Sequence, residues 1–376
     1  MSEPTELLYR PGLEGIIAGE TTVAAVEQSG LSYRGYDIAD LAEHTSFEEC
    51  AHLLLYDDLP TPAALTEFRR RLDEQRSIPE PVIETIRRIP PEVGGMDVLR
   101  TAMSMTAHFD PGTGQGREAL VRQAIRVLAQ VPGIIGARMR TQAGQPPLKP
   151  KPGLSHAAQL LYLALGREPT TIEEKVVNLT LILYAEHEFN ASTFAARVCT
   201  STLSDLYSAV VAAIGTLKGP LHGGANEETM RLMAPFKSAD EARTWTTAAL
   251  ARKEKVSGFG HRVYKHGDHR SHILEGYLPE LAKLRNEAWR VEVYHAIKNT
   301  VWEQKKLHPN VDYPCGLAYY LLGLPLDVYT PIFVASRVSG WCAHIIEQNQ
   351  NNRIIRPLSR YTGPAPRKVV PLAERR

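Results

Sequence analysis

Apolar residues recur at three- and four-residue intervals along most of this chain, and this spacing limits the folds it can adopt. Residues 97–106 and 117–138 follow it, and residues 176–184 and 204–217 are apolar almost all round, as in helices buried among other helices. Strict alternation, typical of a half-buried strand, is scarce. Short apolar runs between the glycines of residues 10–36 indicate a small hairpin or an irregular arm. The sequence therefore predicts an all-α fold with a minor β-hairpin near the N-terminus.

Capping residues, prolines and glycines mark where the helices begin and end. Residues 145–153 hold four prolines and a glycine and predict a loop, and residues 309–314 predict a break that holds one carboxylate. A final long helix is expected over residues 332–347, opened by Pro331. The tail from Arg353 onward has seven basic residues and four prolines and should be extended. Helix starts are predicted at Ser46 with Glu49, Thr61 with Pro62, Thr171 with Glu174, and Ser238 with Glu241.

Composition narrows the class of partner. The chain has 376 residues, 43% of them hydrophobic and 23% charged, with a formal net charge of +1. It therefore lacks the charge signature of a nucleic-acid or membrane-surface protein, and a small molecule is the expected partner. Near the N-terminus, no basic residues precede an apolar run as they do in a signal peptide, and no apolar segment approaches the roughly 20 residues of a membrane span. A cytoplasmic protein is therefore expected.

The four separated cysteines are predicted to be buried free thiols: Cys50, Cys199, Cys315 and Cys342.

Two glycine-rich turns each hold one histidine. Pro220, Gly223 and Gly224 surround His222, and Gly258 and Gly260 precede His261. Such residues break helices, so both imidazoles should lie on exposed backbone bends, where free N–H groups can bind an anion or a carbonyl oxygen. Taken singly, each turn is more typical of an ordinary glycine-containing loop. Asn226 and Glu227 indicate that a helix follows the first turn.

A carboxylate, Asp312, shares this context with His222 and His261, because each lies beside glycine or proline at a break between apolar helices. Two imidazoles and a carboxylate suit proton abstraction from a weak carbon acid, with the carboxylate as base and the imidazoles as donors to the developing oxyanions. Each such group is typically worth about 10²- to 10⁴-fold in rate. The three residues are the candidate catalytic set.

Four histidines within residues 261–272 raise the alternative of a zinc hydrolase that would use His266, His269 and His272. The H-E-x-x-H pattern of helical zinc sites is absent, so no metal is predicted and solvent-facing histidines are the favoured interpretation.

Arg270, Arg337 and Arg356 are single arginines at element edges. Guanidinium groups match carboxylates in a bidentate way, so converging arginines would suit a dicarboxylate substrate. Taken one at a time, an exposed salt bridge or a free surface charge is the favoured interpretation of each.

In this order and at this chain length, several of the stretches above resemble the citrate synthase family. The resemblance covers nearly the whole chain and rests on residues 12–15, 33–36, 186–194, 218–227, 258–265, 310–312, 330–333 and 356–357.

The resemblance implies a nearly all-helical homodimer of the tricarboxylic acid cycle that condenses acetyl-CoA with oxaloacetate and hydrolyses the resulting thioester. The large domain would comprise residues 1–222 and 324–376, and residues 223–323 would form a small domain that closes over the substrates. No cofactor is implied, because the CoA thioester is a substrate.

The resemblance also implies residue roles. Asp312 would be the base, His222 the donor to the enolate, and His261 the group that polarises the oxaloacetate carbonyl. The remaining implied positions are His187, Arg270 and Arg337 for oxaloacetate, Arg356 for the neighbouring subunit's site, and Lys265 with Gly258 and Gly260 for CoA.

Departures from the family pattern leave the acyl group open. His269 replaces a common proline before Arg270, and residues 313–315 differ from the usual pattern after Asp312. Residues 186–189 are similar to members that use propionyl-CoA, and residues 218–222 to plain citrate synthases, so 2-methylcitrate synthase remains an alternative. A non-catalytic helical protein that binds CoA or an anion is the alternative of another class.

Overall fold

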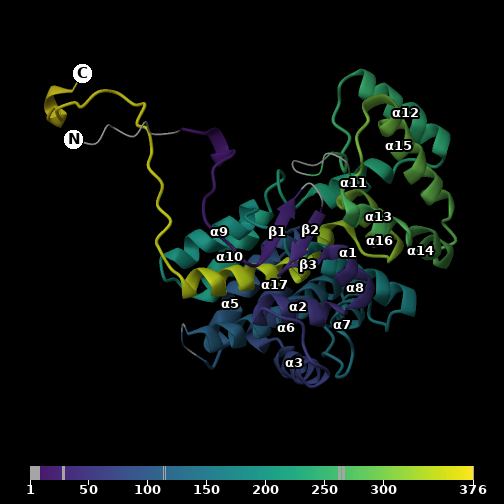
Figure 1. Ribbon diagram of the computed structural model, residues 1–376, viewed down its shortest axis with the longest axis horizontal. Coiled ribbons are helices and arrows are strands. Elements are labelled where there is room, and N and C mark those ends of the chain that lie inside the picture. Colours follow the sequence, from purple (N-terminus) through teal and green to yellow (C-terminus); the bar gives the residue numbers. More distant parts are fainter. Residues whose placement is uncertain are drawn as a thin grey trace.

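The computed structural model describes residues 9–27, 30–112, 114, 116–260, 264 and 267–375. Helices make up most of this part of the chain, and one small sheet lies near its start (Figure 1). The predicted all-α class with a minor β-hairpin is therefore confirmed.

The sheet is an antiparallel meander of β1 (Ala24–Glu27), β2 (Gly30–Tyr33) and β3 (Tyr36–Asp37), with Ala24 opposite Tyr33 and Tyr33 opposite Tyr36. Tyr33 is fully buried, and its hydroxyl lies 3.1 Å from the carbonyl oxygens of Ile182 and Glu186. These bonds fix the sheet against the end of helix α8 (Thr171–Tyr184), a few residues before His187.

Ten helices of the described chain precede the first histidine turn and form the larger body of the molecule. They are α1 (Ile38–His44), α2 (Phe47–Tyr56), α3 (Pro62–Gln75), α4 (Glu80–Arg88), α5 (Gly95–Thr106), α6 (Arg117–Gln142), α7 (His156–Leu165), α8 (Thr171–Tyr184), α9 (Ala191–Ser201) and α10 (Leu206–Leu217).

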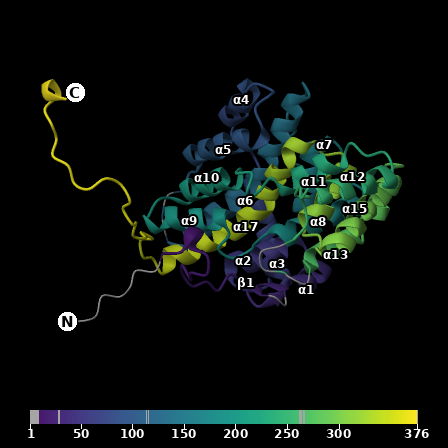
Figure 2. The ribbon, with the colours of Figure 1, turned by 90° about the horizontal axis from the view of Figure 1, so that it is seen from above.

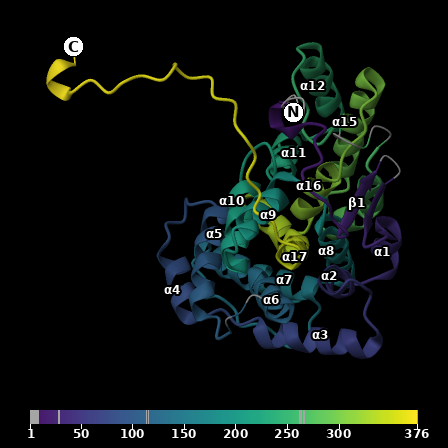
Figure 3. The ribbon, with the colours of Figure 1, turned by 60° about the vertical axis from the view of Figure 1, so that its left-hand side comes forward.

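The long helix α17 (Tyr329–Gln350) is the centre of this body. It packs against α2, α6, α8, α9 and α10, and all three ribbon views show it in the middle of them (Figures 1, 2 and 3). Its side chains are buried almost throughout, and the buried ones include polar and charged residues as well as apolar ones. Arg337, in its middle, is therefore an arginine inside the core.

The six helices between α10 and α17 gather at one end of the molecule. In Figures 1 and 3, α12 and α15 lie farthest out there, while α3 lies at the opposite end. Within this group α12 packs on α15, and α11 packs on α16. The bounds are α11 (Ala225–Met233), α12 (Ala239–Ala251), α13 (His269–Glu275), α14 (Leu278–Leu284), α15 (Trp289–Lys305) and α16 (Asp312–Leu321).

The predicted start signals are mostly confirmed. Ser46 and Glu49 form a capping box on α2, and Thr61 and Ser238 cap α3 and α12. The predicted Thr171–Glu174 box is wrong by one residue, because the structure has it at Thr170 and Glu173. Glu174 instead accepts a 2.6 Å hydrogen bond from the Ser155 hydroxyl, which leaves Glu173 for the cap. The helix predicted at Asn226 and Glu227 is α11, and the one predicted from Ser238 is α12, so both are confirmed.

Two prolines lie inside helices, although residues 309–314 were predicted to be a break and Pro331 was predicted to open the last long helix. Asp312 is the first residue of α16 and Pro314 its third, and Pro331 is likewise the third residue of α17. The first N–H groups of a helix have no partner within it, so a proline there costs no hydrogen bond. Asp312 therefore lies on a helix start and not in the irregular break that the sequence indicated.

The loop at residues 145–153 and the extended tail are confirmed, and the tail leads away from the body in every view (Figure 2). None of the described helices combines the length and apolarity needed to cross a membrane. All four cysteines are free; Cys50, Cys315 and Cys342 are buried and Cys199 is half-buried.

Candidate active site

His222 lies between the end of α10 and the start of α11, on the predicted bend. Its ring is half-buried and not exposed, because Nε2 packs against the first turn of α9. Nε2 lies 2.8 Å from Ser192 Oγ and accepts a 3.2 Å hydrogen bond from the Ser192 backbone N–H. A backbone N–H can only donate, so the ring proton is on Nδ1.

The surroundings of His222 keep its ring neutral. Burial, and secondarily the charge of Arg337, lowers the pKa of His222 to about 4. The positive end of α9 at Ser192 acts in the same direction. Near neutral pH, His222 is therefore an uncharged imidazole whose Nδ1–H can donate to a developing oxyanion.

Asp312 meets a buried tyrosine from the large body. The Tyr184 hydroxyl donates to Asp312 Oδ1 at 2.6 Å, and Asn310 Oδ1 accepts from the Asp312 backbone N–H at 3.1 Å. Burial raises the pKa of Asp312; the Tyr184 bond and the charges of Arg270 and Arg337 oppose that rise without cancelling it. A carboxylate of raised pKa is a stronger base than an exposed one.

Arg270 is buried and held by its own neighbour. Asp268 caps α13 and also binds the guanidinium through two bonds, Nε to Oδ1 at 3.0 Å and Nη2 to Oδ2 at 2.9 Å. Burial lowers the pKa of Arg270, but the Asp268 carboxylate more than offsets this and the pKa is raised. Asp268 Oδ2 also accepts from the Val311 N–H at 3.0 Å, which ties Arg270 to the start of α16 and so to Asp312.

Arg337 is a buried cation without a direct counterion. Its residue is 3% exposed, its Nε donates to the Tyr184 carbonyl oxygen at 2.7 Å, and its guanidinium lies 4.7 Å from the Phe333 ring centroid. In the described part of the chain neither terminal nitrogen makes a hydrogen bond or an ion pair. A buried guanidinium with two free nitrogens is suited to an incoming carboxylate.

The exposed salt bridges considered for Arg270 and Arg337 from the sequence are therefore wrong, since both arginines are buried.

His187 follows α8 and lies half-buried beside Tyr264. Its Nε2 is 3.2 Å from the Tyr264 hydroxyl, and the two rings meet edge to face. The Tyr264 ring is in turn 5.8 Å from the Arg270 guanidinium. These contacts link His187 to Arg270, which gathers with Asp312 and Arg337 around residues 183–184. His222 is linked to this cluster through the charge of Arg337.

Two of the predicted residues, His261 and Lys265, lie outside the described residues. The glycines before them are described. Gly258 has φ +86°, and an added Cβ would come within 2.9 Å of Thr229 and Tyr313. Its carbonyl oxygen accepts from the Asn310 N–H at 2.9 Å, which joins this turn to the segment that leads into Asp312. Gly260 pairs with the same segment through the His308 carbonyl oxygen.

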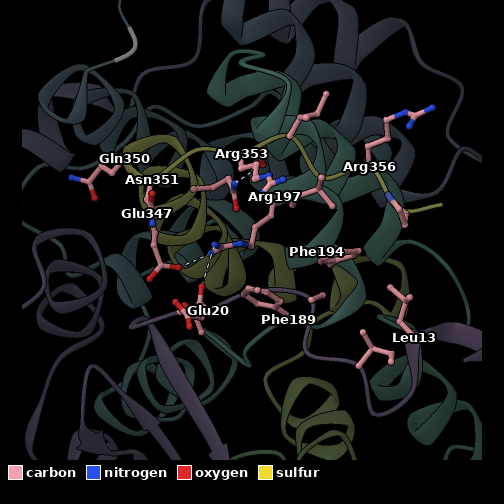
Figure 4. Close-up of a pocket in the computed structure, with 18 of the residues that line it drawn as sticks. Leu13, Glu20, Phe189, Phe194, Arg197, Glu347, Gln350, Asn351, Arg353 and Arg356 are labelled. Atoms are coloured by element: carbon pink, nitrogen blue, oxygen red, sulfur yellow. Dashed lines mark hydrogen bonds and ion pairs between the residues drawn. The ribbon is translucent and has the colours of Figure 1, made fainter. Parts of the chain in front are cut away.

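Arg356 is not part of the cluster in its own chain. It is exposed and lines a cavity of about 690 Å³ at the far end of α17, together with Phe189, Phe194, Arg197 and Glu347 (Figure 4). None of the other predicted site residues that are described lines this cavity.

The zinc alternative gains no support from the residues described. His269 and His272 are exposed, His266 lies outside the described range, and the described residues hold no group of three His, Cys, Asp or Glu side chains that could bind a metal.

Sequence reasoning missed four residues that organise the site: Tyr184, Ser192, Asp268 and Tyr264. Tyr184 was counted among the apolar residues of its helix, although a tyrosine that ends such a run has a hydroxyl that needs a partner. Asp268 stands two residues before Arg270, the spacing of an N-cap, and this was the available signal.

Comparison with known proteins gives a consistent result. The family model described as citrate synthase, C-terminal domain, matches residues 12–358. The chain is 45% identical to Citrate synthase 2 of Bacillus subtilis over 97% of this chain and 98% of that one, and 44% identical to 2-methylcitrate synthase of Shewanella oneidensis over 97% of each.

Solved structures agree. The crystal structure of citrate synthase from Pyrobaculum aerophilum has a TM-score of 0.90 at 36% identity and covers 97% of this chain and 95% of its own. A ternary complex of carboxymethyl coenzyme A and oxaloacetate with citrate synthase from Thermoplasma acidophilum has a TM-score of 0.90 at 35% identity, covering 97% and 99%.

Proposed function

The chain belongs to the citrate synthase family, and from this premise we propose that it condenses acetyl-CoA with oxaloacetate, giving citrate and free CoA. Asp312 removes a proton from the acetyl methyl group, and the enol carbon attacks the carbonyl carbon of oxaloacetate. Water then cleaves the thioester, which releases the CoA thiol.

The observation that carries this proposal is the pairing of a half-buried base with a buried cation that contacts no carboxylate of the described residues. The Tyr184 hydroxyl holds Asp312 and the Tyr184 carbonyl oxygen holds Arg337, whose terminal nitrogens have no partner in the described chain. One carboxylate of oxaloacetate would neutralise Arg337, and Arg270 and His187 would take part in binding the same dicarboxylate. The carbonyl carbon would then lie close to the enol carbon, which converts an encounter of two molecules into an oriented reaction.

His222 contributes an uncharged donor. A methyl group beside a thioester is a weak acid, so its proton leaves only if the carbonyl oxygen is stabilised at the same time. The Nδ1–H of His222 can supply that hydrogen bond, because Nε2 is occupied by Ser192. By resemblance, His261 polarises the oxaloacetate carbonyl and Lys265 contacts CoA.

We further propose that residues 223–323 form the small domain and that the remainder forms the large one. The grouping of α11 to α16 at one end of the molecule supports this division (Figures 1 and 3). Closure would exclude water while the enol forms. The proposed homodimer, with Arg356 supplied to the neighbouring site, is supported by the position of Arg356 away from the cluster of its own chain.

The test is release of free CoA thiol from oxaloacetate and each acyl-CoA. We expect a higher kcat/KM with acetyl-CoA than with propionyl-CoA, and a loss of about 10²- to 10⁴-fold in the Asp312→Ala variant. A clear preference for propionyl-CoA would instead identify a 2-methylcitrate synthase, which the similar identities of the two relatives keep open. Binding of CoA or oxaloacetate without thiol release would favour the non-catalytic alternative.

A further inference from the structure

We propose that Tyr184 is a positioning residue for the base. Its hydroxyl orients the Asp312 carboxylate for proton abstraction, and it does so when the proposed small and large domains are together. This inference rests on the proposed function and adds a residue to it.

The contact is specific to one oxygen of the carboxylate. Tyr184 is 2% exposed, and its hydroxyl donates to Asp312 Oδ1 at 2.6 Å. Within the described chain, Oδ2 makes no hydrogen bond. A carboxylate turns about its last side-chain bond unless something holds it. One fixed oxygen therefore sets the direction of the other, which remains available to take the substrate proton.

Tyr184 also supports the arginine proposed to bind oxaloacetate. Its carbonyl oxygen accepts from Arg337 Nε at 2.7 Å, and its ring packs on Phe333 with centroids 4.5 Å apart. Phe333 in turn lies under the Arg337 guanidinium. The base and the substrate arginine are thus held from one residue, and a reaction between the two substrates depends on their relative placement to within a fraction of an ångström.

The Tyr184–Asp312 hydrogen bond joins the two proposed domains. Tyr184 ends α8 in the large domain, and Asp312 begins α16 in the small domain. Two more contacts cross at the same place, from Arg270 Nη1 to the Leu183 carbonyl oxygen at 3.4 Å and between Tyr264 and His187 at 3.2 Å. If the small domain moves away, the hydrogen bond between Tyr184 and Asp312 breaks. Orientation of the base is therefore coupled to closure.

The hydroxyl also affects the proton affinity of the base. Groups that face Asp312 are Tyr184 from α8, Arg270 and Asp268 from the start of α13, Arg337 from α17, and Cys315 and Tyr319 on its own helix. Burial raises the pKa of Asp312, and the Tyr184 hydrogen bond leads the contributions that lower it. Removing the hydroxyl should thus raise the pKa further. Because the base acts unprotonated, activity should then be lost at a higher pH as the solution is acidified.

Tyr184→Phe tests the inference. In thiol-release assays with the full-length enzyme, we expect kcat to fall about 10- to 100-fold while KM for oxaloacetate changes only a few-fold, because the carbonyl oxygen that holds Arg337 remains. The acid limb of the kcat profile, which reports the enzyme–substrate complex, should move to higher pH. Wild-type kcat with an unmoved acid limb would overturn the inference, and so would a lower kcat with an unmoved acid limb, since that indicates a structural role.

A matched control is Tyr294→Phe. Tyr294 is another fully buried tyrosine, on α15, and neither a hydrogen bond nor an electrostatic interaction links its side chain to Asp312 within the described residues. The acid limb of this variant's kcat profile should coincide with that of the wild type. A pH shift equal to that of Tyr184→Phe would contradict the assignment to Tyr184.

Incorporation of 3-fluorotyrosine at position 184 covers the case in which Tyr184→Phe fails to fold. This residue keeps the ring and hydroxyl but donates more strongly, so the acid limb should move to lower pH; an unmoved limb would overturn the inference. Absence of thiol release by the wild-type enzyme would refute the proposed function itself. Failure of the proposed function can therefore be told apart from failure of the inference about Tyr184.

Discussion

At the residue scale, one hydrogen bond decides where the proton of His222 resides. The Ser192 N–H donates to Nε2, so the neutral ring presents Nδ1–H to the site, and burial holds the pKa at about 4. Burial removes the water that would stabilise the charged ring, and no carboxylate of the described residues contacts the ring to replace that water.

We predict that His222 stays uncharged, with its proton on Nδ1, from pH 8 down to about pH 5. Nitrogen NMR of histidine-labelled protein measures both the tautomer and the titration, and His222→Gln identifies the signal. A resonance that titrates near pH 6.5, or a proton on Nε2, would contradict this prediction.

A second residue-scale feature is a buried series of hydrogen bonds that links Arg197, His344 and Glu186. Arg197 Nη1 donates to His344 Nδ1 at 2.9 Å, so the His344 proton is on Nε2 and is donated to Glu186 Oε1 at 2.9 Å. Glu186 and His344 are both fully buried, and Glu186 Oε2 has no partner. His344 is thus the only side chain of the described chain that hydrogen-bonds the Glu186 carboxylate.

His344→Leu should therefore destabilise the protein by about 3 kcal/mol or more, because it leaves a buried carboxylate without its donor. Urea unfolding measures the effect. Arg70→Ala, which breaks an exposed ion pair with Glu67 and Glu74, is the control and should change the unfolding midpoint little. Equal effects of the two variants would show that burial of Glu186 is not what matters.

At the element scale, the close packing of α6 on α7 depends on a missing side chain. A Cβ on Gly136 of α6 would lie 2.7 Å from the Leu163 carbonyl oxygen of α7. The two helices approach closely only because that position is glycine, even though glycine weakens an isolated helix.

Gly136→Ala should consequently destabilise the protein by about 1–3 kcal/mol through forced separation of the helices. Gly215→Ala is the matched variant in α10, where an added Cβ meets nothing within 4 Å and the residue is exposed. It should stabilise by about 0.5–1 kcal/mol. Unfolding free energies decide the point, and a change of the same sign in both variants would refute the packing explanation.

At the scale of the whole molecule, Asp312 and Arg270 of the α11–α16 group contact residues 183–184 of the body, where Arg337 is also bound, whereas Arg356 lies at the other end of α17 (Figure 4). In the proposed dimer each site takes this arginine from the neighbouring chain, so no chain would be complete by itself.

Mixing two inactive variants tests this directly. Arg356→Ala and Asp312→Ala subunits, unfolded together and reassembled in equal amounts, should recover about a quarter of wild-type activity, because half of the dimers are mixed and each of these has one intact site. Each variant reassembled alone is the control. No recovery, despite mixed dimers seen by native mass spectrometry, would mean that Arg356 does not serve the partner's site.

The sequence by itself determined the helical class, most helix starts and the identity of the reactive side chains. These follow from local rules: apolar spacing fixes a buried helix face, and capping residues and prolines act within one turn. Its errors were local too, such as the box at Thr170 being assigned one residue late. Asp312 was chosen from its place beside proline, and that choice needed no knowledge of its neighbours.

Only the tertiary structure decided which oxygen of Asp312 is held, which nitrogen of His222 carries the proton, and that Arg337 is buried without a counterion. Each depends on residues that are distant in sequence: Tyr184 is 128 positions from Asp312, and Ser192 is 30 from His222. Spacing along a chain carries no information about such pairs, because packing of whole helices brings them together, and burial then sets their charge.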